Sequence, residues 1–246
     1  MGFREFLNIT DRKRAAISDG ITKTFALIIL GSGLIVLIGW ATDIEILKSM
    51  VPGAVTMKAN TAISFVLIGL AVLLFKAGVP FVKNVVPALS VLLVMLIGTI
   101  TLLQYVFGFD AGIDQLLFKG DAHGLYTYSP GRMAVNTAIG LMIFSVSLAF
   151  GLLSKPWAIM VSQLGGLFIL MLSVLPLLGY AYGKENFLSM GEYTRMALPT
   201  ALLFFLSGIS LLTAFPGRGM GLILKSSGPG GFFARRILPL VMVMPV

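Results

Sequence analysis

Long apolar runs are the feature of this sequence that most limits what it can fold into. Each complete run is close to the 20 or so residues that an α-helix needs to cross the hydrocarbon core of a bilayer. Hydrophobic residues make up 57% of the 246-residue chain and charged residues only 11%, against about half and a quarter in soluble domains. The sequence therefore predicts an all-α integral membrane protein. The six complete runs are 21–41, 59–75, 85–107, 133–153, 157–180 and 196–215.

A seventh apolar run begins near residue 232 and continues to Val246. It is too short to cross a bilayer, so we expect a truncated seventh helix after six complete ones. The predicted organisation is a polar segment, 1–20, followed by a multi-pass membrane domain, 21–246. Pro176 lies inside the fifth run and is predicted to kink it, whereas Pro199 lies in the first turn of the sixth, where proline is tolerated.

The distribution of charge predicts the orientation of the chain. Twelve of the 18 lysines and arginines fall on the same side of the predicted membrane as the N-terminus, and most acidic residues fall on the other side. Cytoplasmic loops carry the excess of basic residues, so we expect a cytoplasmic N-terminus. The net charge of +8 then reflects membrane orientation, and we expect the lipid bilayer rather than nucleic acid as the partner.

Two short motifs recur three times in the same order. Trp40, Tyr105 and Tyr180 each end an odd-numbered run, and the pattern Met-x-x-[Asn/Pro]-Thr-Ala opens each even-numbered run. The sequence therefore predicts three helix-pair repeats, over 21–77, 84–153 and 157–215, and such repeats in membrane proteins often meet at a shared site. The second motif occupies 57–62, 133–138 and 196–201.

Polar residues of these motifs form the predicted ligand site on the outer side. Each even-numbered helix has a cation near its start together with hydroxyl or amide groups, and a helix N-terminus attracts anions. The alternative is that the amides and hydroxyls cap or join helices while the cations anchor at lipid headgroups. The residues concerned are Lys58, Asn60, Thr61, Arg132, Asn136, Thr137, Arg195 and Thr200.

Other polar and aromatic residues allow two interpretations each. Trp40, Tyr105 and Tyr180 fit the aromatic belt of a membrane interface, with ligand stacking as the alternative. Asp110 and Asp114, like Glu185 and Glu192, lie in outer loops, where solvated pairing with Arg132 or Arg195 is expected, although the two aspartates are also candidate ligand contacts. The motif methionines Met57, Met133 and Met196, with His123, could bind copper but are more typical of packing.

Residues required for catalysis are absent from the predicted spans. No Asp or Glu lies in the six runs, the single histidine lies in a loop, and cysteine is missing altogether. Proton-coupled transporters usually place such groups at bilayer depth, and the chain contains no phosphate-binding or dinucleotide-binding motif. We therefore expect no catalytic residues, no metal and no cofactor in this chain.

Several spaced motifs resemble the N-terminal multi-pass, MASE-like membrane region of bacterial sensor histidine kinases and diguanylate cyclases. They are Gly39-Trp40, Leu47-Lys48, 57–62, 109–118, 130–138 and 228–236. The resemblance implies a sensory input module of about eight helices in the bacterial inner membrane, a cytoplasmic output domain on the same chain, and possible homodimers. A small-solute transporter or channel, and a structural membrane assembly subunit, are the alternatives.

Overall fold

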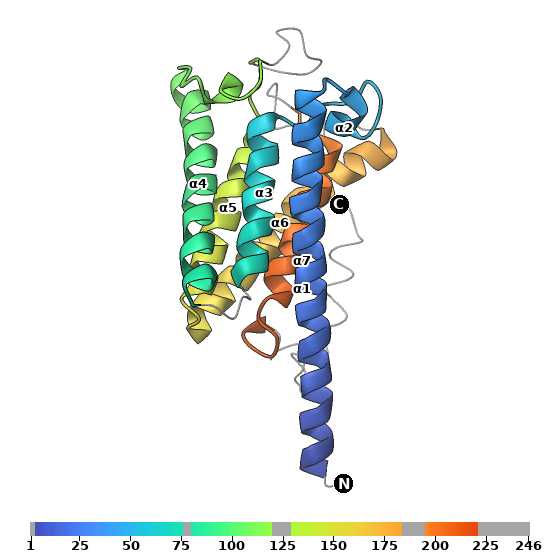
Figure 1. The fold of residues 1–246 in the computed structure, drawn as a ribbon, viewed down its shortest axis with the longest axis vertical. Helices are drawn as coiled ribbons and strands as arrows, with labels where there is room; N and C mark the ends of the chain where they lie inside the picture. The colour runs from blue at the N-terminus through green and yellow to red at the C-terminus, as the bar shows by residue number, and fades with distance from the viewer. Residues whose placement is uncertain (1–2, 76–79, 120–128, 184–194, 221–246) are drawn as a thin grey trace.

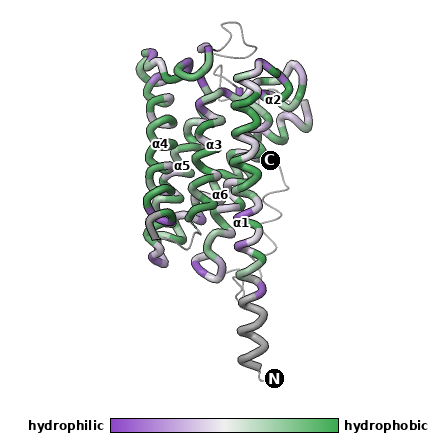
Figure 2. Tube along the Cα trace, viewed as in Figure 1, coloured by the Kyte–Doolittle hydropathy of each residue, from purple (hydrophilic) through white to green (hydrophobic). Residues whose placement is uncertain are grey.

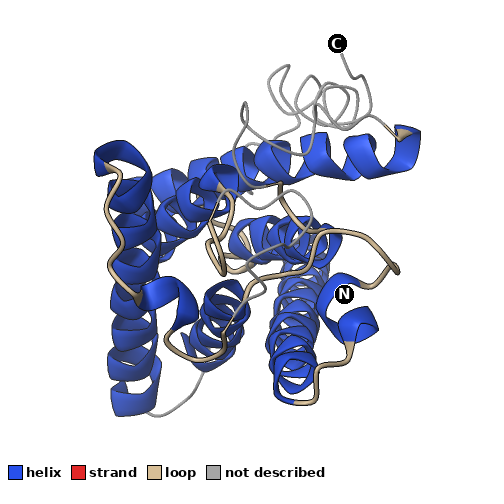
Figure 3. Cartoon of the chain, turned by 90° about the horizontal axis from the view of Figure 1, so that it is seen from above, coloured by secondary structure: helices blue, strands red, loops and turns tan. Residues whose placement is uncertain are grey.

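The computed structural model describes residues 3–75, 80–119, 129–183 and 195–220 (Figure 1). Within these ranges every regular element is a helix, and no strand occurs (Figure 3). The elements are α1 (Phe3–Ala41), α2 (Glu45–Ser49), α3 (Ala59–Phe75), α4 (Pro80–Phe107), the 3-10 turn η1 (Ile113–Gln115), α5 (Val135–Leu152), α6 (Pro156–Tyr182) and α7 (Leu198–Thr213).

All six complete apolar runs form helices, as predicted. The bounds of α3 agree with the predicted run at both ends, and those of α5, α6 and α7 agree within about two residues. The α2 helix and the η1 turn lie in segments that were predicted only as loops. The predicted seventh run falls outside the described residues.

The first helix is much longer than its apolar run. It begins at Phe3, so the polar segment that was predicted to precede the first helix is its N-terminal half. Residues 3–20 contain no proline and a single glycine, Gly20, so nothing in the segment stops a helix that the apolar run nucleates. This half of α1 projects beyond the other helices (Figure 1).

Six helices form a closed ring in chain order. Each of α1, α3, α4, α5 and α6 packs against the next of the six, and α7 packs back against α1. The three helices α3, α5 and α7 also contact one another and therefore form the centre. Phe65, Leu141 and Phe204 of these helices are fully buried, and the rings of Phe65 and Phe204 meet edge to face with centroids 5.0 Å apart.

The outward surface of the ring is apolar. Hydrophobic residues dominate the helices of the bundle (Figure 2). Large exposed hydrophobic side chains concentrate on the long helices α1, α4 and α6, and none lies on α3 or α7. Four helices, α1, α4, α5 and α6, are long and apolar enough to cross a membrane. Exposure of such a surface to water is unfavourable in free energy, whereas contact with lipid tails is not. The fold therefore indicates a membrane protein.

Two of the six predicted membrane spans are shorter than a typical hydrocarbon core. The helices α3 and α7 contain only 17 and 16 residues, which gives lengths of about 26 and 24 Å at 1.5 Å per residue. They are shorter than a typical 30 Å hydrocarbon core, and each begins after a buried non-helical segment, at Met57 and Met196.

The α6 helix continues through Pro176 to Tyr182, and α4 likewise contains Pro87.

Glycines bring paired helices into close contact. A Cβ atom on Gly33 would lie 2.8 Å from the carbonyl oxygen of Ala62, and one on Gly98 would lie 3.0 Å from that of Ala138. In the third pair, a Cβ atom on Gly208 would lie 2.8 Å from the carbonyl oxygen of Gly166. Small residues of this kind let helix backbones approach inside a membrane, where packing drives association.

Candidate functional site

Three equivalent hydrogen bonds define one end of the bundle, which we call the aromatic end. Trp40 Nε1 donates to the carbonyl oxygen of Met57, Tyr105 Oη to that of Met133, and Tyr180 Oη to that of Met196, each at 2.9 Å. Each bond joins the last turns of a long helix, α1, α4 or α6, to the segment that enters the following short helix, α3, α5 or α7. The three half-buried aromatic side chains therefore fix where the short helices begin.

The short helices begin in the same way. Ala62, Ala138 and Ala201 donate the first helical hydrogen bonds, to the carbonyl oxygens of Lys58, Ala134 and Ala197, at 3.0 to 3.1 Å. A threonine is the third residue of each helix: Thr61, Thr137 and Thr200.

The motif asparagines satisfy backbone groups of the first turn. Asn60 Oδ1 accepts the amide hydrogen of Thr61 at 2.8 Å, and Asn136 Oδ1 accepts that of Thr137 at 3.0 Å. This arrangement agrees with the capping interpretation of the two asparagines, because a first-turn amide has no partner within the helix. In the third motif Pro199 takes the place of asparagine.

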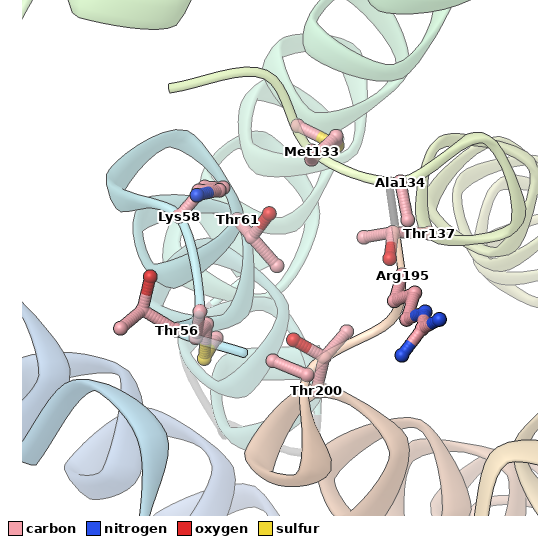
Figure 4. Close-up of a pocket in the computed structure, with 10 residues that line it drawn as sticks. Thr56, Lys58, Thr61, Met133, Ala134, Thr137, Arg195 and Thr200 are labelled. Atoms are coloured by element: carbon pink, nitrogen blue, oxygen red, sulfur yellow. The ribbon is translucent and has the colours of Figure 1, made fainter. Parts of the chain in front are cut away.

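The N-terminal ends of α3, α5 and α7 meet at one small pocket (Figure 4). Its volume of about 10 Å³ is close to that needed for one water molecule. Five of the residues predicted for the ligand site line it together: Lys58, Thr61, Thr137, Arg195 and Thr200. Thr56, Met57, Met133, Ala134 and Ala197 complete the lining.

Two of the residues that line this pocket are cations. Among the described residues its lining contains two cations, Lys58 and Arg195, and no carboxylate. The positive ends of three helix dipoles are directed towards the same place. An arrangement of this kind attracts an anion or the negative end of a polar group.

Arg132 belongs to a separate buried cluster at the same end. Its Nε atom donates to Asp114 Oδ2 at 2.8 Å, and both side chains are more than nine-tenths buried. Gln104 Nε2 donates to the same oxygen at 2.7 Å, and Asn60 Nδ2 donates to Asp114 Oδ1 at 3.3 Å. The cluster thus links α3, α4, η1 and the segment before α5.

The prediction that Asp114 pairs in solvent is wrong. The η1 turn folds the loop after α4 back over the bundle, and this places the Asp114 carboxylate inside it. Gly131 permits the approach, because it has φ of +73° and a Cβ atom there would collide with the carbonyl oxygen of Asp114. The headgroup role that was the alternative for Arg132 is wrong for the same reason.

A larger cavity of about 370 Å³ adjoins this cluster. Asp110 lies on its rim, with a 75% exposed side chain 4.0 Å from the Arg132 guanidinium, as expected for a solvated pair. The buried Gln104, which also lines the cavity, was not among the predicted residues, and its Oε1 atom has no hydrogen-bond partner among the described residues. A polar residue in the last turn before the aromatic Tyr105 was the signal that could have identified it.

Trp40 also contacts a cation that was not predicted to belong to the site. Lys48 Nζ lies 4.8 Å from the centroid of the Trp40 ring and donates to Asp43 Oδ1 at 2.7 Å. The hydrogen bond from Lys48, together with its positive charge, lowers the pKa of Asp43 below its ordinary value. The short α2 helix, which carries Lys48, brings this cation under the aromatic ring.

The described residues favour packing for the motif methionines. Met57, Met133 and Met196 are at most 1% exposed and belong to the hydrophobic core. Groups of three or more His, Asp or Glu residues that could hold a metal ion do not occur in the part of the chain that the structure describes. His123, Glu185 and Glu192 lie outside the described residues.

Comparison of the chain with protein-family models, with curated proteins and with solved structures finds no match. Its function must therefore be inferred from its own residues and geometry.

The tyrosine hydrogen bonds to the methionine carbonyls lead to a direct prediction. We expect Tyr105→Phe and Tyr180→Phe each to lower the free energy of unfolding by about 0.5–1.5 kcal/mol, because each leaves a carbonyl without its donor. Thermal unfolding in detergent, followed by size-exclusion chromatography, measures the effect. Tyr182→Phe is the matched control, since the side chain of Tyr182 is on the same helix as Tyr180 and is 68% exposed. Equal stability of all three variants would show that these bonds do not hold the helix entries.

Proposed function

We propose that this chain is the membrane-embedded sensory input module of a bacterial signalling protein. In this proposal it lies in the inner membrane and passes a signal from the outer side to a cytoplasmic histidine kinase or diguanylate cyclase domain. The observation that supports it is the pocket at the aromatic end, which is lined from the N-terminal ends of α3, α5 and α7. A ligand held there contacts all three helix pairs, so its affinity depends on how the pairs pack, and that differential affinity is what a sensor requires.

We infer that the three helix pairs are structural repeats. The equivalent bonds from Trp40, Tyr105 and Tyr180 support this inference, as do the three threonines in the same place of each short helix. Gly33 and Gly98 give further support, because each lies seven residues before its aromatic residue and closely approaches the alanine after the motif threonine. Three similar units around one pocket can shift relative to one another without internal rearrangement.

We infer that the aromatic end faces outwards and that the N-terminus is cytoplasmic. The distribution of lysine and arginine supports this orientation. The projecting half of α1 then lies on the cytoplasmic side, where it is accessible to an output domain.

Spin-label distance measurements in lipid nanodiscs test the proposal. The chain has no cysteine, so labels can be placed at Ile17 and Leu153 alone, which are 64% and 55% exposed at the end opposite the pocket. We expect Lys58→Ala and Arg195→Ala, whose residues line the pocket, to shift the distance between these labels by about 1–2 Å, the size of helix shifts in signalling proteins. Lys119→Ala is the control, because Lys119 is exposed on the aromatic side of the bundle and lines neither cavity.

Unchanged distances in both variants, with normal insertion, would contradict coupling between the aromatic end and the opposite end. Solute or ion flux through liposomes that contain the chain would instead favour a transporter or channel. A partner protein that co-purifies in fixed ratio, with no response to pocket variants, would favour an assembly subunit.

A further inference from the structure

One buried side-chain oxygen at the larger cavity has no hydrogen-bond partner among the described residues. It is Oε1 of Gln104, a fully buried residue near the end of α4 that lines this cavity. The orientation of the amide is fixed, because its Nε2 atom donates to Asp114 Oδ2 at 2.7 Å and a reversed amide would bring two acceptors together. Buried polar groups normally have a partner, so this oxygen calls for a donor from a ligand.

A second buried glutamine shows the arrangement that Gln104 lacks. Gln163 in α6 is 1% exposed, and its Oε1 atom accepts the backbone amide hydrogen of Met220 at 2.6 Å. Gln163 lines neither of the two cavities at the aromatic end. The glutamine in the packed part of the bundle thus has a backbone partner for its oxygen, whereas the glutamine without one borders a cavity.

The cavity is large enough for a small organic molecule. Its volume of about 370 Å³ is at the lower end of the range of roughly 300–1,000 Å³ that is typical of ligand sites. Phe109 and Pro130 contribute apolar surface to its lining, which is also usual in such sites. The ligand therefore combines an apolar body with a group that can donate a hydrogen bond.

The charged groups of the cavity favour a ligand with a positive charge. Its described lining contains two carboxylates, Asp110 and Asp114, and one cation, Arg132. Both oxygens of Asp114 already accept hydrogen bonds from side chains of the buried cluster. The Asp110 carboxylate is 75% exposed and therefore accessible to a ligand. The cavity thus offers a ligand one accessible negative charge and one uncharged acceptor.

These groups fit an ammonium ion better than a metal ion. Ca²⁺ takes about six to eight oxygen ligands, whereas the described lining offers the Gln104 oxygen and one accessible carboxylate, and Arg132 would repel a divalent ion. A primary ammonium group has three N–H donors and a single charge. It can donate to the Gln104 oxygen while its remaining N–H groups bond to Asp110 or water.

We propose that this cavity binds a small organic molecule that carries a primary ammonium group on an apolar body. The ammonium group donates to Gln104 Oε1, the Asp110 carboxylate balances its charge, and the apolar body lies against Phe109 and Pro130. The proposed function rests on the smaller pocket, so this inference goes beyond that function and does not depend on it.

Isothermal titration calorimetry of the whole chain in nanodiscs, with empty nanodiscs as the blank, tests the proposal. The probe is 2-phenylethylamine, for which we expect saturable binding. Its N,N,N-trimethyl derivative keeps the charge but has no N–H group, so we expect it to bind about tenfold more weakly. The matched anion 3-phenylpropionate should show no saturable binding. Absence of saturable amine binding would overturn the proposal, and so would equal affinity for the amine and either of the other compounds.

Two variants test whether the amine binds in this cavity. We expect Gln104→Met to weaken amine binding about tenfold, because the acceptor is lost, and Asp110→Asn to weaken it about threefold, because an exposed charge is lost. Gln163→Met and Asp43→Asn are the matched controls, a buried glutamine and a 94% exposed aspartate that line neither cavity. Both controls should bind the amine as the wild type does.

Unchanged amine affinity in both Gln104→Met and Asp110→Asn would also overturn the proposal, because the amine would then bind elsewhere. Gln104→Met loses the hydrogen bond to Asp114 as well. If that variant does not insert or fold, Asp110→Asn and the comparison of the amine with its trimethyl derivative on the wild-type chain still decide the outcome.

Discussion

Replacement of Asp114 by alanine is expected to lower the free energy of unfolding by about 3–5 kcal/mol, the usual cost of removing one partner from a buried ion pair. The Arg132 guanidinium would keep a 3.4 Å contact to the carbonyl oxygen of Phe109, the face of Tyr105 and a 4.0 Å pair with the exposed Asp110. Gln104 and Asn60 would lose their shared acceptor as well. Thermal and denaturant unfolding of the purified chain in detergent measures the loss.

Two further variants distinguish the contribution of the buried ion pair to stability from that of the loop that carries Asp114. Asp110→Ala should change the free energy of unfolding by less than about 1 kcal/mol, because the Asp110 side chain is 75% exposed. The double variant Asp114→Leu with Arg132→Met should be more stable than Asp114→Ala alone, since it removes both buried charges. An Asp114→Ala variant as stable as Asp110→Ala would show that the buried pair contributes nothing.

Introduction of a methyl group at Gly69 is expected to force α1 and α3 apart. A Cβ atom there would lie 2.6 Å from the backbone nitrogen of Leu30 and 2.7 Å from the carbonyl oxygen of Ala26. Backbone atoms of a helix cannot move aside as side chains do, so we expect Gly69→Ala to cost at least the 1–3 kcal/mol or so that is typical of overpacked cores. The same unfolding measurement reports it.

Gly31→Ala is the matched control for this substitution. Gly31 lies in α1 close to the contact, but a Cβ atom there would have no neighbour within 4 Å. Alanine should therefore be neutral or stabilise the helix by up to about 1 kcal/mol through its higher helix propensity. If both variants unfold alike, the close contact between α1 and α3 is not maintained in the membrane protein.

The helices of this protein could be predicted well because each is a continuous apolar run, although only four of them are long enough by themselves to cross a membrane. The prediction for α3, 59–75, agrees with the structure at both ends. Where the run was flanked by polar sequence that still favours a helix, as before residue 21, the apolar pattern underestimated the length of α1. The positions of helix ends therefore depended on local propensity as well as on hydropathy.

The candidate site could be predicted only in part. Lys58, Thr61, Thr137, Arg195 and Thr200, which the recurring motif indicated, line one pocket, and their binding of a ligand stays a prediction. Asn60, Arg132 and Asn136 do not line that pocket. The sequence contained no sign that the three aromatic side chains bond to the methionine carbonyls, because those pairs are separated by 16 to 28 residues.

The sequence by itself determined that this chain is a bundle of apolar helices with a polar motif at the start of every second one. The reason is that bilayer thickness and backbone hydrogen bonding act on each segment separately. Only the tertiary structure decided that Asp114 is buried beside Arg132 and that three threonine hydroxyls share one small pocket. Burial of a loop carboxylate and convergence of side chains from three helices depend on how separate segments pack, and hydropathy contains no information on that packing.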